Sequence, residues 1–337
     1  MMDTAATASP LLVSVSPHIK DRETTARIIW TVNAALAPAA VMGAFYFGPR
    51  AVLSMVLCIA TAVLCEYLFQ KLLKKKITIQ DGSAFLTGLL LAFNLPPAVP
   101  FYVPVLGAIV AILLTKQLFG GLGFNIFNPA LMGRVFLVIT FPKLLTIWSA
   151  PTAAFTALDA HTCATPLNIL KMDGMGKLLE SFGSASTMYF QLLIGHRGGC
   201  IGETCIAALL AGALFLLYKK YITWHIPVAY LGTAALIAWI FGGKGMLFSG
   251  DPLLHLLSGG IILGSFFMAT DYVTSPSSRA GRLLFGAGCG FLTMLIRLKG
   301  GYPEGVMFSI LIMNCFAPLI DRGFRPRLFG SVKGTKK

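Results

Sequence analysis

The chain has 337 residues, of which 56% are hydrophobic and only 12% are charged, and its mean hydropathy is +0.78. This excess of apolar residues excludes an ordinary soluble domain, because apolar runs of about 20 residues are what bilayer-spanning helices require. The net charge of +14 does not point to nucleic acid, since the basic residues lie between the apolar runs.

Ten apolar runs lie in two groups of five around a more polar stretch at residues 150–200. The third run is short and ends in Asn94-Leu95-Pro96-Pro97, which predicts a tilted or broken helix. Residues 1–27 lack an apolar core, so we expect a cytoplasmic segment rather than a signal peptide, and residues 322–337 form a basic tail. The ten runs fall at about 28–47, 51–69, 83–95, 99–119, 129–149, 201–218, 226–243, 253–270, 281–297 and 304–321.

The distribution of the 27 lysines and arginines orients these predicted spans. With the N-terminus in the cytoplasm, most basic residues fall in inner segments, as the positive-inside rule requires. The run from Lys71 to Lys76 and the tail from Arg322 onward carry much of this asymmetry. The sequence therefore predicts a multi-pass protein of the cytoplasmic (inner) membrane, with both termini inside and residues 150–200 outside.

The two halves, 28–149 and 201–321, share an ordered pattern of small and polar residues. Because five spans make up each half, this pattern predicts two inverted five-helix repeats, an all-α architecture that resembles that of urea transporters. Inverted repeats with helices broken by glycine and proline place a ligand or ion site near the bilayer midplane. The alternative is that small residues only allow close helix packing. The matching positions are Asp81, Leu86-Thr87-Gly88, Pro97 and Gly120-Gly121 against Asp251, Leu257-Ser258-Gly259, Pro276 and Gly300-Gly301.

Several charged residues lie toward the ends of the predicted spans. Asp81 and Asp251 are candidates for an ion path if they face the bundle interior, but solvated helix caps are the alternative for both. The same alternative applies to Glu66 and Asp271. We expect the remaining two, Arg134 and Arg297, to reach the membrane interface by snorkelling.

The connection between the fourth and fifth spans, residues 120–129, is rich in glycine and carries two asparagines. Asn128 followed by Pro129 predicts the N-cap and first turn of the next helix. Asn125 lies between two phenylalanines and caps no predicted helix. Gly121 would let the backbone approach a ligand closely. Amides beside aromatic rings suit a flat heteroaromatic ligand.

The polar stretch at 150–200 carries no hydrolase constellation, because no Ser/His/Asp pattern or metal-ligand spacing includes its two histidines. Cys200 and Cys205 are the only close cysteine pair and have no matching second pair, so we predict no metal site.

Thr165 before Pro166 fits a turn. A hydroxyl near an acid and flanked by small residues also suits the access of a modifying enzyme.

The segment from Asp159 to Thr165 resembles the flavinylation motif Asp-x-x-Ser/Thr-Gly-Ala-Ser/Thr, whose last hydroxyl carries FMN through a phosphoester bond. Cys163 stands where that motif has glycine. From about Ser16 to Asp321 the chain is similar to D-type subunits of the Rnf electron-transport complex. It is similar, more distantly, to B-type subunits of the sodium-translocating NADH:quinone reductase. The stretches that carry this resemblance are DGSAFLTGLLLAFNLPP, GGLGFNIFNPALMGR, ATDYVTSP and IRLKGGYPEGVMFSILIMNCFAPLID.

The resemblance implies two flavins. Thr165 would carry covalent FMN, with Thr162 nearby and Asp159 assisting a flavin transferase or orienting the threonine. The segment 198–204 would pack beside this FMN at the start of the sixth span. A second flavin, non-covalent riboflavin, would bind toward the cytoplasmic side. The implied neighbours of FMN in segment 198–204 are Gly202, Glu203 and Thr204, and those of riboflavin are Asn125, Asn128 and Gly121.

The function implied is that of an electron-carrying subunit of an ion-translocating ferredoxin:NAD oxidoreductase, which moves Na⁺ or H⁺. Its partners would be the A, B, C, E and G types of Rnf subunit and the lipid bilayer, with no nucleic acid. The chain lacks a dinucleotide-binding glycine fingerprint and a cluster-type cysteine set, so NAD and iron–sulfur sites would belong to partners. The alternatives are a passive channel or carrier, a structural scaffold, and a B-type component of a quinone reductase.

Overall fold

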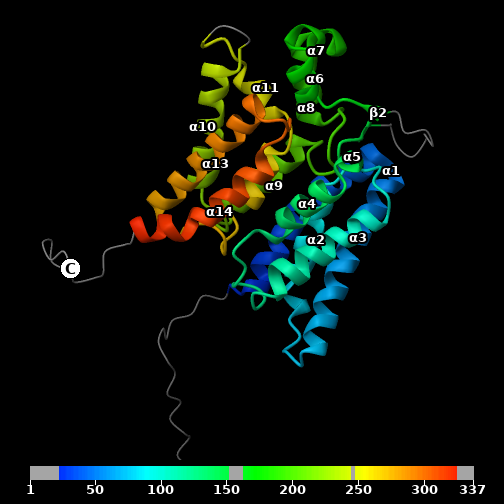
Figure 1. Ribbon diagram of the computed structural model, residues 1–337, viewed down its shortest axis with the longest axis vertical. Helices are drawn as coiled ribbons and strands as arrows, with labels where there is room; N and C mark the ends of the chain where they lie inside the picture. Colours follow the sequence, from blue (N-terminus) through cyan, green and yellow to red (C-terminus); the bar gives the residue numbers. More distant parts are fainter. Residues whose placement is uncertain (1–22, 152–161, 244–246, 325–337) are drawn as a thin grey trace, which may run out of the picture.

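A computed structural model describes residues 23–151, 162–243 and 247–324. The described chain is mostly helical (Figure 1). Three of its helices, α1, α13 and α14, are long and apolar enough to cross a membrane by length and composition. The first half contains α1 (Thr25–Leu72), η1 (Ile79–Asp81), α2 (Ser83–Phe93), α3 (Tyr102–Ile109), η2 (Val110–Gln117, a π-helix), α4 (Pro129–Thr140), α5 (Pro142–Leu145) and β1 (Trp148–Ser149).

The segment that starts at residue 162 contains β2 (Thr162–Cys163), α6 (Pro166–Met172), α7 (Met175–Phe182) and α8 (Ala185–Ile194). The second half contains α9 (Ile206–Tyr218), α10 (His225–Phe241), α11 (Pro252–Leu257), α12 (Ile261–Leu263), η3 (Gly264–Met268, a π-helix), α13 (Arg279–Lys299) and α14 (Val306–Gly323).

Each predicted apolar run contains a helix, but two runs differ from a simple span. The first two runs are joined in α1, which is interrupted at Gly48. Gly48 has a φ of +66°, which favours glycine, and Pro49 cannot donate a backbone hydrogen bond, so the two halves run in different directions (Figure 1). The fifth run stays helical only to Thr140, because Pro142 follows and starts the separate turn α5.

The third run forms a short helix that ends early, as predicted, and the eighth run is also broken. Helix α2 has 11 residues and ends before Asn94, so at roughly 1.5 Å per residue it is too short to cross a bilayer alone. The eighth run is divided into α11, α12 and η3. The order of elements agrees with five helical runs on each side of the polar stretch, while the inverted symmetry of the halves stays a prediction.

The polar stretch is itself helical, which the sequence pattern did not predict. Leu178, Met188 and Leu192 from α7 and α8 form a small core with Leu254 of α11, separate from the main apolar core. In Figure 1 these helices lie at one end of the molecule, and the turn after α1 lies at the other. This stretch is therefore a small folded cap on the helical bundle.

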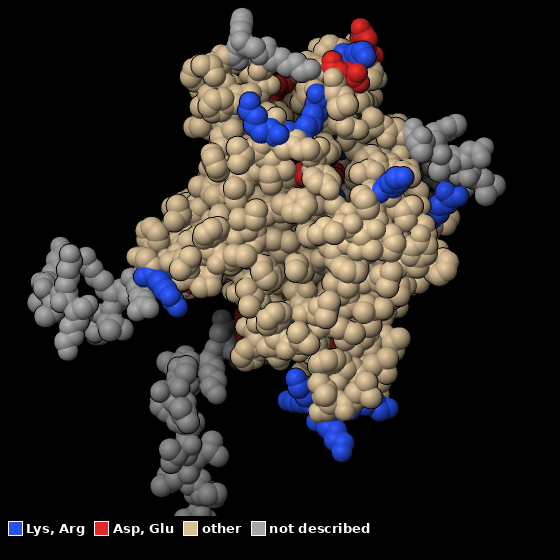
Figure 2. All heavy atoms as spheres, in the orientation of Figure 1, with Lys and Arg blue, Asp and Glu red and all other residues tan. Residues whose placement is uncertain are grey.

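The surface carries few charges across its middle. On the face drawn in Figure 2, a broad band with few charged side chains separates a basic end from an end with both charge signs. The basic end lies over the turn after α1, where the sequence has Lys71, Lys74, Lys75 and Lys76. This band and the apolar helices are typical of a multi-pass membrane protein.

Candidate functional site

The segment 162–165, which we call the attachment segment, ends the stretch that resembles a flavinylation motif and leads directly into α6. Thr165 is the N-cap of this helix, since its Oγ1 accepts a hydrogen bond from the Asn168 backbone N–H at 3.3 Å, and Pro166 follows at the first helical position. The side chain of Thr165 is half-buried and that of Ala164 is exposed. The capping arrangement satisfies the turn interpretation, and residues 163–165 remain partly or fully exposed to solvent. Asp159 and His161 lie outside the described residues.

Cys163 departs from the motif glycine, and its surroundings explain how the larger residue is accommodated. Strand β2 pairs with β1 in antiparallel register, Cys163 opposite Trp148 and Thr162 opposite Ser149. A Cβ added at Gly198 would collide with Cys163 Sγ, so only glycine fits beside this thiol. Burial raises the pKa of the Cys163 thiol, which favours its neutral form.

The segment 198–204 packs against the end of α2. The backbone N–H groups of Ile201 and Gly202 donate to the carbonyls of Leu95 and Phe93, at 3.1 and 2.9 Å. A Cβ at Gly202 would collide with Phe93 Cβ, so the contact requires glycine. Thr204 is buried and donates its hydroxyl to the Ile201 carbonyl at 3.1 Å. Gly202 and Thr204 thus have structural duties, and their nearness to FMN stays a prediction.

Glu203 belongs to a buried charge centre built around Arg134. The guanidinium of Arg134 lies 3.6 Å from Glu203 Oε1 and 2.8 Å from Glu304 Oε2. It also donates to Asn94 Oδ1 at 2.7 Å and to Cys200 Sγ at 3.5 Å. The prediction that Arg134 snorkels to the interface is wrong, because partners from three other segments hold it inside.

Two more buried arginines lie next to this centre. Arg297 donates to the carbonyls of His255 and Ser258 at 2.6 and 3.0 Å, so the prediction that it snorkels is also wrong. Arg197 donates to the carbonyls of Leu257 and Glu203. Burial lowers the pKa of Arg197 to about 10, which still leaves it charged at neutral pH. The three guanidinium groups outnumber the two carboxylates, so the centre is net positive.

The charge centre lies close to α6. A Cβ added at Gly259, whose φ is +68°, would lie 2.9 Å from Leu167 Cδ1 and 3.0 Å from Glu304 Oε1. Leu167 is two residues after Thr165, so the attachment segment and the buried acids are neighbours. The atoms of Cys200, Glu203 and Glu304 that could bind a metal lie within 4.8 Å of one another. The guanidinium groups of Arg134, Arg197 and Arg297 together outweigh the two carboxylates of this set, which disfavours a cation there.

A cavity of about 470 Å³, which we call the amide cavity, lies where the predicted amides come together with aromatic residues. Asn125 and Asn128 both line it, whereas Gly121, with a φ of +100°, lies in the adjoining turn and is not among its lining residues. The other polar and aromatic residues in its wall include Ser83, Thr87, Lys116, Tyr221, Phe266, Phe267, Asp271 and Tyr272. Sequence reasoning missed Lys116 and the 266–272 segment, although the latter overlaps a stretch that carries the family resemblance.

Asn125 and Asn128 differ in which of their side-chain amide atoms remain without a hydrogen bond. Asn128 caps α4 as predicted, accepting from the N–H groups of Ala130 and Leu131, and its Nδ2 donates to the Met268 carbonyl at 3.3 Å. Asn125 donates from Nδ2 to the Phe127 carbonyl at 3.1 Å. Within the described residues no hydrogen bond engages Asn125 Oδ1, which therefore offers a free acceptor to a ligand.

The candidate ion-path acids have capping contacts. Asp81 accepts from the Ser83 N–H and hydroxyl at 2.8 and 2.6 Å, and Asp251 caps α11 at Leu254 and accepts from the Tyr189 hydroxyl. Both are half-buried, and their role in ion movement stays a prediction. Asp271 caps its own turn through Val273 and Thr274. Glu66 is different: the prediction of a solvated cap is wrong, because its side chain is buried against Lys116.

A second, larger cavity of about 960 Å³ opens beside α6. Leu167, Lys171 and Asp251 line it from the capping helices and the start of α11, and His255 and Arg297 line it from the helical bundle. Lys171 is anchored at its wall by hydrogen bonds to the carbonyls of Gly300 and Tyr302. The attachment segment therefore lies next to a cavity whose wall carries charges of both signs, with Asp173 and Asp251 beside the basic residues.

Comparison with known proteins places this arrangement in a family. A family model described as the NQR2, RnfD, RnfE family matches residues 12–330. The chain belongs to this family. The predicted family membership is thereby confirmed, and the match extends over nearly the whole chain.

The most informative relatives are the D subunits of ion-translocating complexes. The D subunit of a proton-translocating ferredoxin:NAD(+) oxidoreductase complex from Clostridium ljungdahlii is 50% identical over 319 residues, which are 95% of this chain and 96% of that protein. The Na(+)-translocating counterpart from Acetobacterium woodii is 44% identical over 330 residues, 97% of this chain and 98% of that one. The D subunit of an ion-translocating oxidoreductase complex from Escherichia coli is 38% identical over 351 aligned positions, 96% and 99% of the two chains.

Proposed function

We propose that this chain is the membrane electron-carrier subunit of an ion-translocating ferredoxin:NAD oxidoreductase, with covalent FMN on Thr165 and riboflavin in the amide cavity. The observation that carries the proposal is the pairing of an open attachment segment with an amide-lined, aromatic cavity in a chain of this family. When bound, the two flavins would supply one-electron transfer between the two sides of the membrane. The A, B, C, E and G types of Rnf protein would be its partners.

The residues of the chain suit these roles. Thr165 Oγ1 lies on a solvent-accessible segment at the end of the molecule occupied by α6, where a flavin transferase can reach it (Figure 1). The amide cavity is lined by Thr25 in the first turn of α1, and the beginning of that helix, dark blue in Figure 1, lies away from that end. Asn125 Oδ1 can accept from the imide edge of a flavin, and Phe266 and Phe267 supply apolar wall.

Covalent attachment is tested by replacing Thr165. We expect Thr165→Ala to abolish flavin fluorescence of the denatured band while the protein still accumulates in the membrane, because only this hydroxyl would carry the phosphoester. Thr162→Ala is the matched control and should keep its fluorescence. Fluorescence that survives in Thr165→Ala but disappears in Thr162→Ala would move the attachment to the other hydroxyl.

The non-covalent flavin is tested at Asn125. Asn125→Leu should lower the riboflavin released by acid extraction, because a flavin donor that loses its acceptor costs about 1–3 kcal/mol. Covalent FMN on Thr165 should be unchanged. A full equivalent of riboflavin in this variant would show that the flavin binds elsewhere.

Orientation is tested by cysteine labelling. Ser184 is exposed at the start of α8, so a cysteine there should react with an impermeant reagent from outside. A cysteine at Lys336, which lies outside the described residues, should react only from the cytoplasmic side. The opposite pattern would place Thr165 out of reach of an extracytoplasmic transferase.

A further inference from the structure

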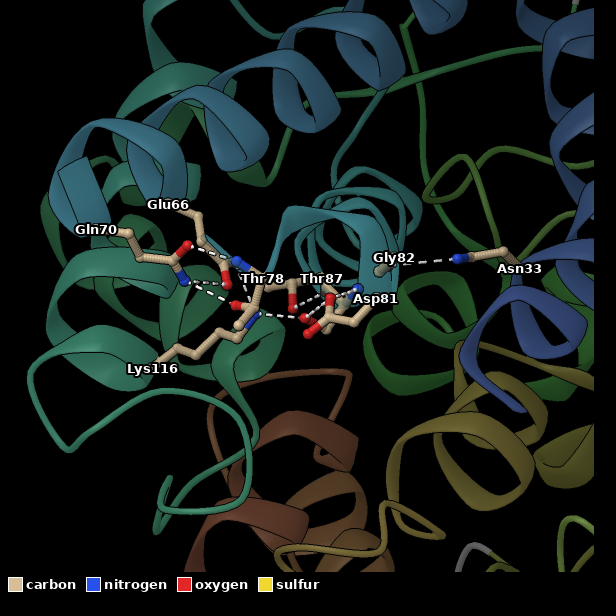
Figure 3. A network of polar contacts seen from close by, with 9 residues as sticks. Asn33, Glu66, Gln70, Thr78, Asp81, Gly82, Thr87 and Lys116 are labelled. Atoms are coloured by element: carbon tan, nitrogen blue, oxygen red, sulfur yellow. Dashed lines mark hydrogen bonds and ion pairs between the residues drawn. The ribbon is translucent and has the colours of Figure 1, made fainter. Parts of the chain in front are cut away.

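A buried ion pair forms part of the wall of the amide cavity. Lys116, in the π-helix η2, is only 2% exposed, and its Nζ lies 2.6 Å from Glu66 Oε2 (Figure 3). Glu66 comes from the second half of α1 and is 1% exposed. The same Nζ donates to Ser83 Oγ at 2.6 Å, at the start of α2. Lys116 and Ser83 both line the cavity.

The ammonium of Lys116 keeps an unused donor. An ammonium has three N–H groups, and hydrogen bonds to Glu66 and Ser83 use two of them. Among the described residues the third has no acceptor. An ion buried without a partner is costly, so the carboxylate of Glu66 stabilises the positive charge beside the cavity.

The pair is the centre of a longer polar network. Glu66 Oε1 accepts from Gln70, which bonds to Thr78, and Ser83 donates its hydroxyl to Asp81 at 2.6 Å (Figure 3). Glu66 contacts the ammonium directly, and Asp81 is linked to it only through the Ser83 hydroxyl. Among these three charged groups Lys116 alone lines the cavity. Asp271, the other charged group in the cavity wall, bonds to the Val273 N–H and to the Thr274 hydroxyl.

In this arrangement the position of the Lys116 ammonium depends on the charge of the ligand in the amide cavity. Negative charge added in the cavity attracts Lys116 Nζ, while the ion pair with Glu66 holds it back. The attraction acts at short range inside the protein, where charges interact several-fold more strongly than in bulk solvent. Removing Lys116 or Glu66 should therefore change the ligand's electron affinity in opposite directions.

We propose that Lys116 sets how readily the ligand of this cavity accepts an electron, and that Glu66 limits its effect. The inference rests on the proposed function, in which the ligand is riboflavin. One electron arrives from the reduced flavin on Thr165, which is oxidised by one electron, and the cavity flavin is reduced by one. Lys116 keeps its proton, so its role is electrostatic and no covalent bond to it forms or breaks.

The test is a redox titration of the purified full chain carrying Thr165→Ala, so that only the non-covalent flavin contributes to the spectrum. We expect Lys116→Met to make this flavin at least tenfold harder to reduce, which is about 59 mV for a one-electron couple. Glu66→Gln should make it easier to reduce. Lys177→Met is the matched control, because Lys177 forms an exposed ion pair with Asp173 on the capping helices and should leave the potential unchanged.

Measuring the amount of riboflavin released by extraction distinguishes failure of the proposed function from failure of the inference about Lys116. If the parent protein holds no non-covalent flavin, the proposed function fails and this inference fails with it. If riboflavin is present but Lys116→Met and Glu66→Gln leave its potential unchanged, the role of Lys116 is overturned and the flavin site stands. Should Lys116→Met not fold, Glu66→Gln decides alone: a shift toward easier reduction supports the inference, and an unchanged potential overturns it.

Discussion

Two buried charge networks in this protein have similar composition and different surroundings. Around Arg134, the guanidinium contacts Asn94, Cys200, Glu203 and Glu304, which come from the end of α2 and from the loops before α9 and α14. Around Lys116, a single ammonium contacts Glu66 and Ser83 and lines a cavity. Arg134 and these four partners line neither of the two cavities described above, whereas Lys116 lines the amide cavity.

The difference follows from the chemistry of the two cations. Arginine has five donors in a rigid fork and can join several segments at once, while lysine is a compact charge on a flexible stem. Arg134 therefore fastens the two halves of the chain below the attachment segment. Lys116 is held by two partners only and can respond to a ligand. A buried charge is a functional candidate when it lines a cavity that can hold a ligand.

The largest effect is expected from removing Arg134, the hub of the first network. Arg134→Met takes away the guanidinium that contacts both buried acids, Glu203 and Glu304, which costs roughly 3–5 kcal/mol. We expect little folded protein in the membrane and a lowered midpoint of thermal unfolding for what remains. Arg50, exposed at the kink of α1, is the matched control. Equal accumulation of Arg134→Met and Arg50→Met would show that the network does not hold the halves together.

The second prediction concerns the pair at Lys116. Lys116→Met alone leaves Glu66 buried with Gln70 as its remaining partner, whereas the double variant Glu66→Gln/Lys116→Met removes both charges. The double variant should be more stable than Lys116→Met by about 1–3 kcal/mol, because no charge is left unpaired. Thermal unfolding of the parent and the two variants measures this coupling. A double variant no more stable than the single one would contradict a paired, charged network.

The third prediction separates the two asparagines. Asn128→Ala removes the N-cap of α4 and should lower stability by about 1 kcal/mol, whereas Asn125→Leu should change riboflavin content with little change in the unfolding midpoint. Equal losses of stability in the two variants would make both residues structural. Unfolding followed by tryptophan fluorescence measures the first quantity and flavin extraction the second.

The smallest effect is expected at the contact between the capping helices and the bundle. Tyr189→Phe removes a hydrogen bond to Asp251, worth about 0.5–1.5 kcal/mol at most because the pair is only half-buried. Burial, and then the hydrogen bond with Asp251, raises the pKa of Tyr189 to about 12 from 10.0. Since the folded-state pKa is the higher one, this stabilisation is complete below about pH 10 and is lost as pH rises toward 12. The thermal unfolding midpoints of the parent protein and of Tyr189→Phe should therefore differ below about pH 10 and converge toward pH 12. A difference between these two midpoints that stays the same at about pH 12 would contradict this assignment.

Particular residues show which features of the structure could be predicted from the sequence alone. The cap at Asn128-Pro129 and the break at Asn94 were predictable because both depend on residues adjacent in the chain. The roles of Arg134, Arg297 and Glu66 were not. Their partners lie 40 to 170 positions away, so at the sequence level each resembled an interfacial or solvated charge.

By itself the sequence determined that this is a helical membrane protein of the NQR2, RnfD, RnfE family, where its apolar runs lie, and which threonine is the candidate for flavin attachment. These properties depend on composition, periodicity and short motifs, which are local. Only the tertiary structure decided that Asn125 shares a cavity with Lys116 and Asp271, and that Glu203 meets Glu304 across Arg134. Helix packing brings distant polar groups together because each must find a partner once it leaves water.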